Sequence, residues 1–533
     1  MSLKRPLRKL GMAISEFAIL NLLILSGCTV GPDFCKPKAN ITKNWYAQDP
    51  NVTNGQINQQ WWKTFNDPVL DQLVEQAYRQ NLPLQIAGLR ILEARARLAI
   101  AIGEQYPQQQ EVFGNVSRVR LSRNAVNVTG IPHDFWNYEL GFDAVWELDF
   151  WGKYRRSIES QQAILIASVA DYDNALVSLV AEVGRTYTVI RTFESLIELA
   201  RQNARVQKEG LQIAESRFRN GATTELDVTQ ARSLLESTLA SIPRLQIGLE
   251  QSQNALSTLL GQPVGPVRTR LEQQKKPIPV APTRVAVGMP AELLRRRPDI
   301  RSAELLAAAQ SARIGVAKAD LYPSFALSGQ IGFQTTSTNG LNFEHLFDGG
   351  SLFYNAGPTF NWPILNYGRI KNSVRVQDAQ FQQLLVNYEN TVLRAAQEVE
   401  DSMVGYIKAQ QTRVFEQNSV AAAQRSVEIA LSQYREGAVD YQRVLDTQRE
   451  LLQQQNNLTQ TNSDISTNLI ALYKALGGGW ELSIGKPFVP AATVTEMRQR
   501  TDWGRILPAE PLPQSLNPPK PAREMPLLQR PDW

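Results

Sequence analysis

Residue types that perform catalysis or bind metals are scarce in this chain. Among 533 residues there are two histidines, His133 and His345, and two cysteines, Cys28 and Cys35. The two histidines lie far apart in the sequence, and neither has the spacing of a metal-ligand pair or of a Ser-His-Asp triad. We therefore expect polar loop positions for both histidines. We predict that the protein is not an enzyme and that it uses no catalytic residue, no metal and no cofactor.

Cys28 follows a segment with the properties of a secretory signal. A basic stretch at 4–9 precedes an apolar run at 17–25, which is too short for a stable membrane-spanning helix. The motif Leu25-Ser26-Gly27-Cys28 resembles a bacterial lipobox, in which the cysteine is lipidated and begins the mature chain. We therefore predict a signal peptide at 1–27, with translation from Met1 or Met12, and lipidation of Cys28. The alternative is an ordinary signal peptide, and lipidation would leave Cys35 as a free thiol.

The positive charge of the chain is not arranged for nucleic-acid binding. The formal net charge is +5 at pH 7. Four basic residues and Glu16 place 4 − 1 = +3 of this charge in the first 27 residues, which leaves 5 − 3 = +2 for the remainder. Nucleic-acid interfaces need positive charge gathered into a patch or a stripe. We therefore predict no nucleic-acid partner.

The chain contains two copies of one unit. Tyr106-Pro107 recurs as Tyr322-Pro323 and Trp146 recurs as Trp362, each at an offset of 216 residues. The same offset relates Phe218-Arg219-Asn220-Gly221 to Tyr434-Arg435-Glu436-Gly437. Because one register holds without a gap across many Gly, Pro and Trp positions, we infer a tandem duplication. Repeat 1 covers 81–261 and repeat 2 covers 297–477.

Each copy predicts two strands followed by two very long helices. Apolar and polar residues alternate from 139 to 148 and from 325 to 334, which indicates strands with one apolar face. Runs of good helix formers without proline then extend from 152 to 242 and from 364 to 486. The expected strands lie at about 110–122, 137–149, 323–335 and 351–363, and the expected long helices at 153–219, 225–260, 369–435 and 441–476.

These elements are difficult to fit into an ordinary globular domain. A helix at 153–219 would be about 100 Å long at 1.5 Å per residue. Four strands cannot close a barrel that has a lumen. Open strand edges are excluded from lipid, because each unpaired backbone group costs on the order of several kcal/mol there. If the strands face lipid, several chains must pool them; a soluble sandwich with an aromatic core is the alternative that the strand pattern leaves open.

Motifs along most of the chain resemble one family. The segment from Cys28 to Phe34 is similar to the mature start of outer membrane factor lipoproteins, and Trp61-Trp62 with 67–70 is similar to their first helix. The stretch 293–300 is similar to the motif that opens their second repeat, and 434–449 matches their helix-turn segment. Over nearly all of 28–485, the chain thus resembles the TolC-type outer membrane factors. The match is to the lipoprotein branch that serves RND (resistance-nodulation-division) efflux pumps.

This resemblance implies an α+β membrane protein that acts as a homotrimer. Three chains would form a twelve-stranded β-barrel in the outer membrane, and twelve helices would continue it as an α-barrel tunnel through the periplasm. The implied partners are a periplasmic adaptor (membrane fusion) protein, an inner-membrane RND pump and outer-membrane lipid. Small molecules such as drugs or toxic compounds would pass through passively, after the adaptor and the pump open the periplasmic tip.

The segments outside the two repeats would anchor the chain and surround its middle. The expected divisions are a lipidated N-terminal segment with the first helix at 28–80, an equatorial linker at 262–296, and an equatorial segment with a Pro-rich disordered tail at 478–533.

The resemblance also implies a periplasmic gate, formed by Asp446, Arg449 and Tyr434. Charge-assisted hydrogen bonds would hold such a constriction closed. A helix would place Asp446 and Arg449 on one face, because they are three residues apart. From the residues alone, Asp446 and Arg449 would be an ordinary solvated surface pair. The family resemblance favours a gate instead. The tip turns are expected at Gly221, Thr224, Gly437 and Asp440.

Two other functions are compatible with the sequence. A protein-exporting duct of a type I secretion system would share the architecture, although the lipobox and the motif at 293–300 favour the pump branch. A periplasmic coiled-coil lipoprotein with a purely structural role is an alternative from a different class. It predicts a soluble oligomer once Cys28 is removed.

Overall fold

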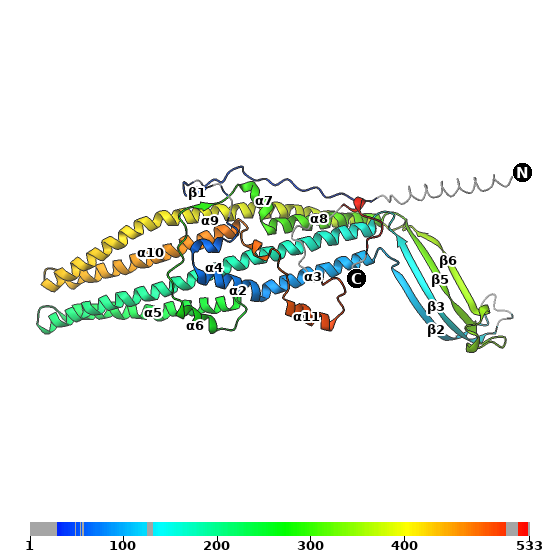
Figure 1. Cartoon of the computed structure of the whole chain (residues 1–533), viewed down its shortest axis with the longest axis horizontal. Helices are drawn as coiled ribbons and strands as arrows, with labels where there is room; N and C mark the ends of the chain where they lie inside the picture. The colour runs from blue at the N-terminus through cyan, green and yellow to red at the C-terminus, as the bar shows by residue number, and fades with distance from the viewer. Residues whose placement is uncertain are drawn as a thin grey trace.

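The computed structural model describes residues 29–47, 49–53, 55, 58–124, 130, 132–507 and 521–530. The predicted signal peptide and Cys28 lie outside the described residues, so lipidation of Cys28 stays a prediction. The described chain is a long rod with a β-sheet at one end and two helical hairpin turns at the other (Figure 1). Cys35 is an exposed free thiol.

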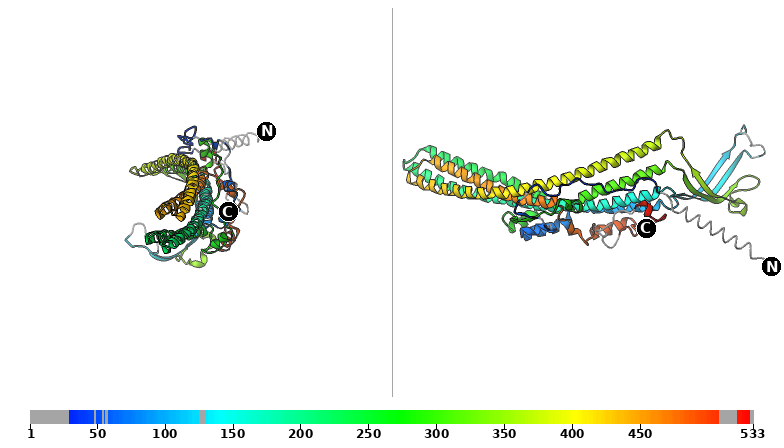
Figure 2. Two further views of the ribbon diagram at one scale, coloured as in Figure 1. Left: turned by 90° about the vertical axis from the view of Figure 1, so that its left-hand side faces the viewer. Right: turned by 90° about the horizontal axis from the view of Figure 1, so that it is seen from above.

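Two pairs of long helices form the body of the rod. In the first pair, α4 (Lys153–Arg219) turns into α5 (Glu225–Leu259). In the second pair, α9 (Arg369–Glu436) turns into α10 (Tyr441–Ala475). These bounds differ from the predicted ones by no more than one residue. Towards the sheet, α3 (Leu82–Gly103) packs on α4, and α8 (Pro298–Ala319) packs between α4 and α9. Viewed end on, the helices follow an open arc (Figure 2).

Local signals fix where the first helices begin. Asp67 caps α2 (Pro68–Gln80) by accepting a hydrogen bond from the backbone nitrogen of Val69 at 2.9 Å. Asn81 caps α3 in the same way, with the nitrogen of Leu84 at 2.9 Å. Each helix also has a proline within its first two positions, where the missing N–H removes no intrahelical bond.

The four long strands form one antiparallel sheet. Its order is β2 (Gln109–Arg120), β3 (Asp134–Leu148), β5 (Ser324–Thr336) and β6 (Leu352–Asn361). Within the described chain, β2 and β6 each have a neighbour on one side only. Both histidines lie in loops at the far end of this sheet, since His133 precedes β3 and His345 ends the short helix η3 (Phe343–His345), which is followed by η4 (Gly349–Ser351).

The strand register separates an apolar face from a polar face. The row Val112, Phe142, Ile331 and Tyr354 runs across all four strands on one face. The adjacent row, Glu111, Asp143, Gln330 and Asn355, lies on the other face because successive side chains alternate.

Two aromatic rings on the polar face of the sheet pack over glycines of the neighbouring strands. Phe113 pairs with Gly141, and Phe353 pairs with Gly332. A Cβ atom at Gly141 would lie 2.5 Å from Cζ of Phe113, so the ring occupies the space of a missing side chain.

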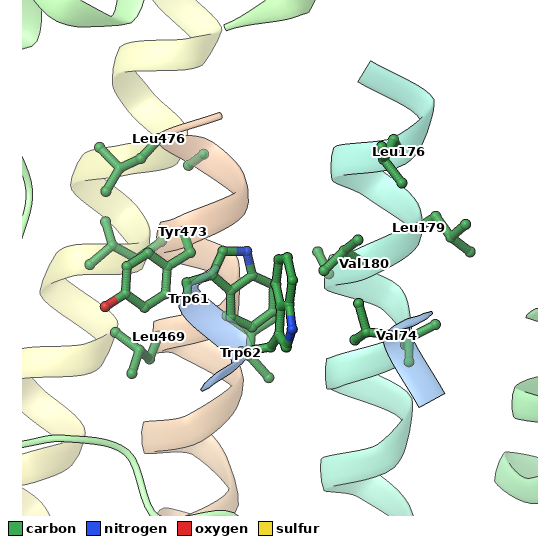
Figure 3. Packing of buried hydrophobic residues seen from close by; sticks show 14 of the residues in the cluster. Trp61, Trp62, Val74, Leu176, Leu179, Val180, Leu469, Tyr473 and Leu476 are labelled. Carbon is green, nitrogen blue, oxygen red and sulfur yellow. The ribbon is translucent and has the colours of Figure 1, made fainter. Parts of the chain in front are cut away.

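The main apolar core lies at the middle of the rod. Trp61 and Trp62 belong to the short helix η1 (Trp61–Phe65) and are buried between α4 and α10 (Figure 3). Trp61 stacks on Tyr473, with ring centroids 5.6 Å apart. Helix α4 contains an 18-residue window apolar enough to cross a membrane, and 67% of that window is buried in the protein. Its hydrophobicity is therefore accounted for by this core.

The equatorial segments join at the same level. Strand β1 (Val52–Thr53) pairs in parallel with β4 (Val285–Ala286), which links the N-terminal segment to the linker between the repeats. The linker also contains the short helices α6 (Pro266–Gln273), η2 (Pro290–Glu292) and α7 (Leu293–Arg296). Arg297 then binds Asp299 and Glu398, each at 2.7 Å.

The prediction of a disordered tail within 478–533 is wrong for the described parts of that segment. η5 (Trp480–Ser483) lies in the expected equatorial segment. The Pro-rich tail after it, expected to be disordered from Pro487 onward, contains α11 (Ala491–Arg500) and η6 (Ala522–Glu524). Met497 and Leu507 pack against Leu92 of α3. The proline-rich composition suggested a segment without a core of its own. The apolar side chains of the tail instead pack against α3 and α4.

Candidate gate at the helix tips

The two hairpin turns have the geometry that their sequences predict. Gly221 and Gly437 have φ angles of 70° and 83°, the left-handed conformation that ends a helix at low cost in glycine. Thr224 and Asp440 are the N-cap residues of α5 and α10. The Asp440 carboxylate accepts a hydrogen bond from the nitrogen of Arg443 at 3.3 Å.

Tyr434 lies inside the bundle of the two hairpins. Its side chain is 1% exposed and belongs to an apolar cluster supplied by α4, α5, α9 and α10. The Tyr434 hydroxyl donates a hydrogen bond to Oδ2 of Asp227 on α5 at 3.1 Å. The same carboxylate oxygen accepts a hydrogen bond from the Thr223 hydroxyl.

Arg217 of α4 makes a further contact with Tyr434. Its guanidinium lies over the Tyr434 ring, 4.7 Å from the centroid, and donates a hydrogen bond to the Tyr434 carbonyl oxygen. Arg217, Asp227 and Tyr434 therefore join the first helix pair to the second. A cation over an aromatic face and a hydrogen bond to a carboxylate are both stronger in a desolvated site.

The electrostatics of the site keep the Tyr434 phenol protonated. Burial raises the pKa of Tyr434 to about 12, and the negative charge of Asp227 acts in the same direction. A neutral phenol retains the proton that it donates to Asp227. Loss of the phenol proton therefore does not break the contact at physiological pH.

The structure does not bring Asp446 and Arg449 to Tyr434. Both side chains are exposed on α10, whereas Tyr434 is buried on α9. Asp446 accepts a hydrogen bond from Nε2 of Gln442 at 2.8 Å, one turn earlier on the same helix. Their role in a gate stays a prediction.

Asp227 and Arg217 are the residues that the predicted gate omits. Their positions in the sequence are unremarkable, because each contacts its partner only after two hairpins pack together. One signal was available: the 216-residue offset aligns Tyr434 with Phe218, which has no hydroxyl. Because phenylalanine has no side-chain donor, only the second copy can supply this hydrogen bond.

Above the tip, the two helix pairs meet along polar side chains. Asn203 of α4 donates to Gln455 of α10 at 2.8 Å, and Thr192 donates to Ser463 at 2.8 Å. Between this level and the tip, Gln207, Gln448 and Tyr441 are buried, and their side-chain polar atoms have no hydrogen-bond partner among the described residues. We call Thr192, Asn203, Gln207, Gln448, Gln455 and Ser463 the polar seam.

Comparison with known proteins identifies the family to which this chain belongs. The family model described as outer membrane efflux protein matches residues 73–262 and 289–478, one match in each repeat. The pyoverdine export outer membrane protein OpmQ of Pseudomonas putida is 32% identical, over 87% of this chain and 96% of that protein. The probable outer membrane lipoprotein SilC of Salmonella typhimurium is 29% identical, over 87% and 98%. The structure of the outer-membrane channel OprN superposes with a TM-score of 0.77 at 32% identity, covering 85% of this chain and 100% of that one. With both repeats matched and full-length relatives covered, the chain belongs to the outer membrane efflux protein family.

Proposed function

We propose that three copies of this chain form the exit channel of a tripartite RND-type efflux system in the outer membrane. Small molecules such as drugs or toxic compounds would leave the cell through it. The observation that carries this proposal is the open four-stranded sheet, which has one apolar face and one polar face, and whose two outer strands have no second neighbour among the described residues. Transport through such a pore is passive and involves no bond chemistry, in keeping with a family of efflux channels.

The sheet supports a shared barrel. On its apolar face Val112 is 78% exposed, Ile331 is 53% exposed and Tyr354 is 77% exposed in the isolated chain. Lipid would cover these side chains, and the polar row at Glu111 and Asp143 would then face the lumen. Pairing β6 of one copy with β2 of the next would satisfy both free edges, as lipid requires.

The helices support the same assembly. Helices α9 and α3 are the two ends of the row α9, α8, α4 and α3. α9 exposes Val386, Leu393 and Phe415. At the other end of the row, α3 exposes Ile86 and Ile100. Contact between these two ends of neighbouring copies would bury both sets and close the helical arc into a tunnel.

The proposed partners follow from the assembly. Lipidation of Cys28 would anchor each copy in the outer membrane, a proposal supported by the lipobox and by the name of the relative SilC. A periplasmic adaptor and an inner-membrane RND pump would act at the tips, where the hairpin turns are the most distant part of the rod from the sheet (Figure 1). The contact of Tyr434 with Asp227 and Arg217 would hold the tip closed until they engage. Asp446 and Arg449 would line the mouth of the tunnel.

Conductance in a planar bilayer, together with the mass of the detergent-solubilised protein, tests the proposal. We expect a trimer with small, rarely opening currents that favour cations, because three Asp446 carboxylates would make the mouth of the tunnel negative. Replacing Asp446 and Arg449 together by alanine should increase the leak, and an unchanged conductance in this double variant would remove both residues from the gate. A monomer without conductance would instead favour the structural coiled-coil lipoprotein.

A further inference from the structure

The C-terminal segment 521–530 extends beyond the part of the chain that matches the family. The family match ends at residue 478, yet this segment returns to the junction between helices and sheet (Figure 1). There it lies beside residues 29–33, the first described residues after Cys28. We call 29–33, which is irregular and pairs in no sheet, the anchor strand, and we call 521–530 the C-terminal segment.

The anchor strand is seated between α4 and α8 by direct backbone contact. The nitrogen of Val30 donates a hydrogen bond to the carbonyl of Trp151 at 3.0 Å. Gly31 has a φ of 99°, and a Cβ atom there would lie 2.4 Å from Cα of Gly315. Gly152 likewise leaves room for Thr29, whose Cγ2 would lie 2.7 Å from an added Cβ. The strand therefore occupies a slot that admits no extra carbon atom.

A buried arginine connects the slot to two carboxylates. Arg156 is 1% exposed and binds Asp33 of the anchor strand and Glu159 of α4, each at 2.8 Å. Its Nε also donates to the carbonyl oxygen of Val30 at 3.2 Å. Removing one partner from a buried ion pair leaves an uncompensated charge and is strongly destabilising.

The C-terminal segment uses the same two carboxylates. The nitrogen of Ala522, which is fully buried, donates to Oε2 of Glu159 at 3.2 Å. Arg523 binds Oδ2 of Asp33 at 3.2 Å. Asp33 and Glu159 are thus each shared between Arg156 and the C-terminal segment. Because the groups are shared, the seating of the anchor strand and the docking of the C-terminal segment are coupled.

Apolar and reciprocal polar contacts hold the remainder of the segment. Met525 is buried against Ala101, Ile102 and Ile158 at the facing ends of α3 and α4. Gln529 donates its backbone nitrogen to Gln105 at 3.0 Å, and its carbonyl accepts from the Tyr106 hydroxyl at 2.7 Å.

We propose that the C-terminal segment is a clasp that locks the anchor strand into its slot, and so fixes the attachment point of the predicted lipid at the base of the sheet. The segment that binds this surface is residues 521–530 of the same chain. The clasp does not depend on the proposed channel activity.

Hydrogen exchange of the purified full-length protein in detergent tests the clasp. Met525→Ala removes the buried anchor of the segment, and Leu528→Ala is the matched control because Leu528 is 43% exposed. We expect exchange of the Val30 amide to become about tenfold faster in M525A, since its protection reports the seating of the strand. The control should exchange at the rate of the unaltered protein.

Two further variants make the result decisive. Arg523→Ala, with Arg530→Ala as its control, should loosen the anchor strand without altering the apolar contact. Asp33→Ala should conversely accelerate exchange within 521–530, because coupling is reciprocal. Release of the C-terminal segment in M525A without any change at Val30 would overturn the proposal. A protein that shows this coupling but no conductance would contradict the channel and not the clasp.

Discussion

At the scale of single residues, the Tyr434 hydroxyl provides the most specific test of the gate. Tyr434→Phe keeps the buried ring and removes the hydrogen bond to Asp227. A hydrogen bond to a charged group contributes about 1.5–3 kcal/mol, and about 1.4 kcal/mol is a tenfold change in an equilibrium. We expect the frequency of channel openings in a planar bilayer to increase by at least about tenfold.

A hydroxyl in the same cluster supplies the control for that variant. Tyr441 stacks edge-on against Tyr434, with centroids 5.1 Å apart, and its hydroxyl has no partner among the described residues. Tyr441→Phe removes no hydrogen bond and should therefore not increase the opening frequency. Equal effects of the two variants would show that Asp227 does not hold the tip closed.

A buried carboxyl at the equator makes the stability of the protein depend on pH. Burial raises the pKa of Asp173 to about 7, with nearby Glu481 adding to the shift and Arg301 and Ser483 opposing it. The folded state therefore holds the proton more tightly than the unfolded state. The protonated carboxyl contributes to the free energy of unfolding at low pH, and this contribution is lost as pH rises from about 4 to about 7. Asp173→Asn cannot ionise. Its melting temperature relative to the unaltered protein should be higher at about pH 8 than at about pH 4.5, and a constant difference would contradict the shifted pKa.

At the scale of elements, the long helices were predictable because their signals are local. Proline-free runs cover α4, α9 and α10, and Gly221 and Gly437 mark the two hairpin turns. Helix α5 continues through Pro243 to Leu259, so the proline-free run does not set its end. The packing of the tail against the helices was not predictable from the sequence. Met497 and Met525 are buried on surfaces that exist only once α3 and α4 have folded. The same limit applies to the gate. Tyr434 was identified through a family resemblance, while Arg217 and Asp227 depend on how two hairpins pack.

The polar seam predicts where the two helix pairs are least tightly joined. Gln207 and Gln448 are buried with unpartnered amides, which destabilises the contact between α4 and α10. Replacing both by leucine should raise the melting temperature by about 2 °C, and should make channel openings rarer. The matched control replaces exposed glutamines on the same helices, Gln202 and Gln453, by leucine. A lower melting temperature for the buried pair alone would mean that the amides are paired.

At the scale of the whole molecule, the two faces of the sheet predict opposite responses to charge. A lysine at Ile331 would lie on the apolar face, at a cost of about 2–4 kcal/mol near the centre of a bilayer. We expect Ile331→Lys to reduce the yield of membrane-inserted trimer. Gln330→Lys places the same charge one residue away on the polar face and should be tolerated. Equal yields of trimer from the two variants would contradict the assignment of the faces.

The glycines beneath the aromatic rings have a consequence for the width of the pore. Phe113 lies across Gly141, so its ring rests along the wall of the sheet and does not stand upright from it. In a closed barrel of three chains, the polar face turns inward, and every such ring would then be folded back out of the bore. A bulky residue at position 141 would displace the ring towards the axis at three points on one circumference. In the proposed trimer, Gly141 would thus widen the bore, because the wall lacks a side chain at that position and the ring occupies the free space.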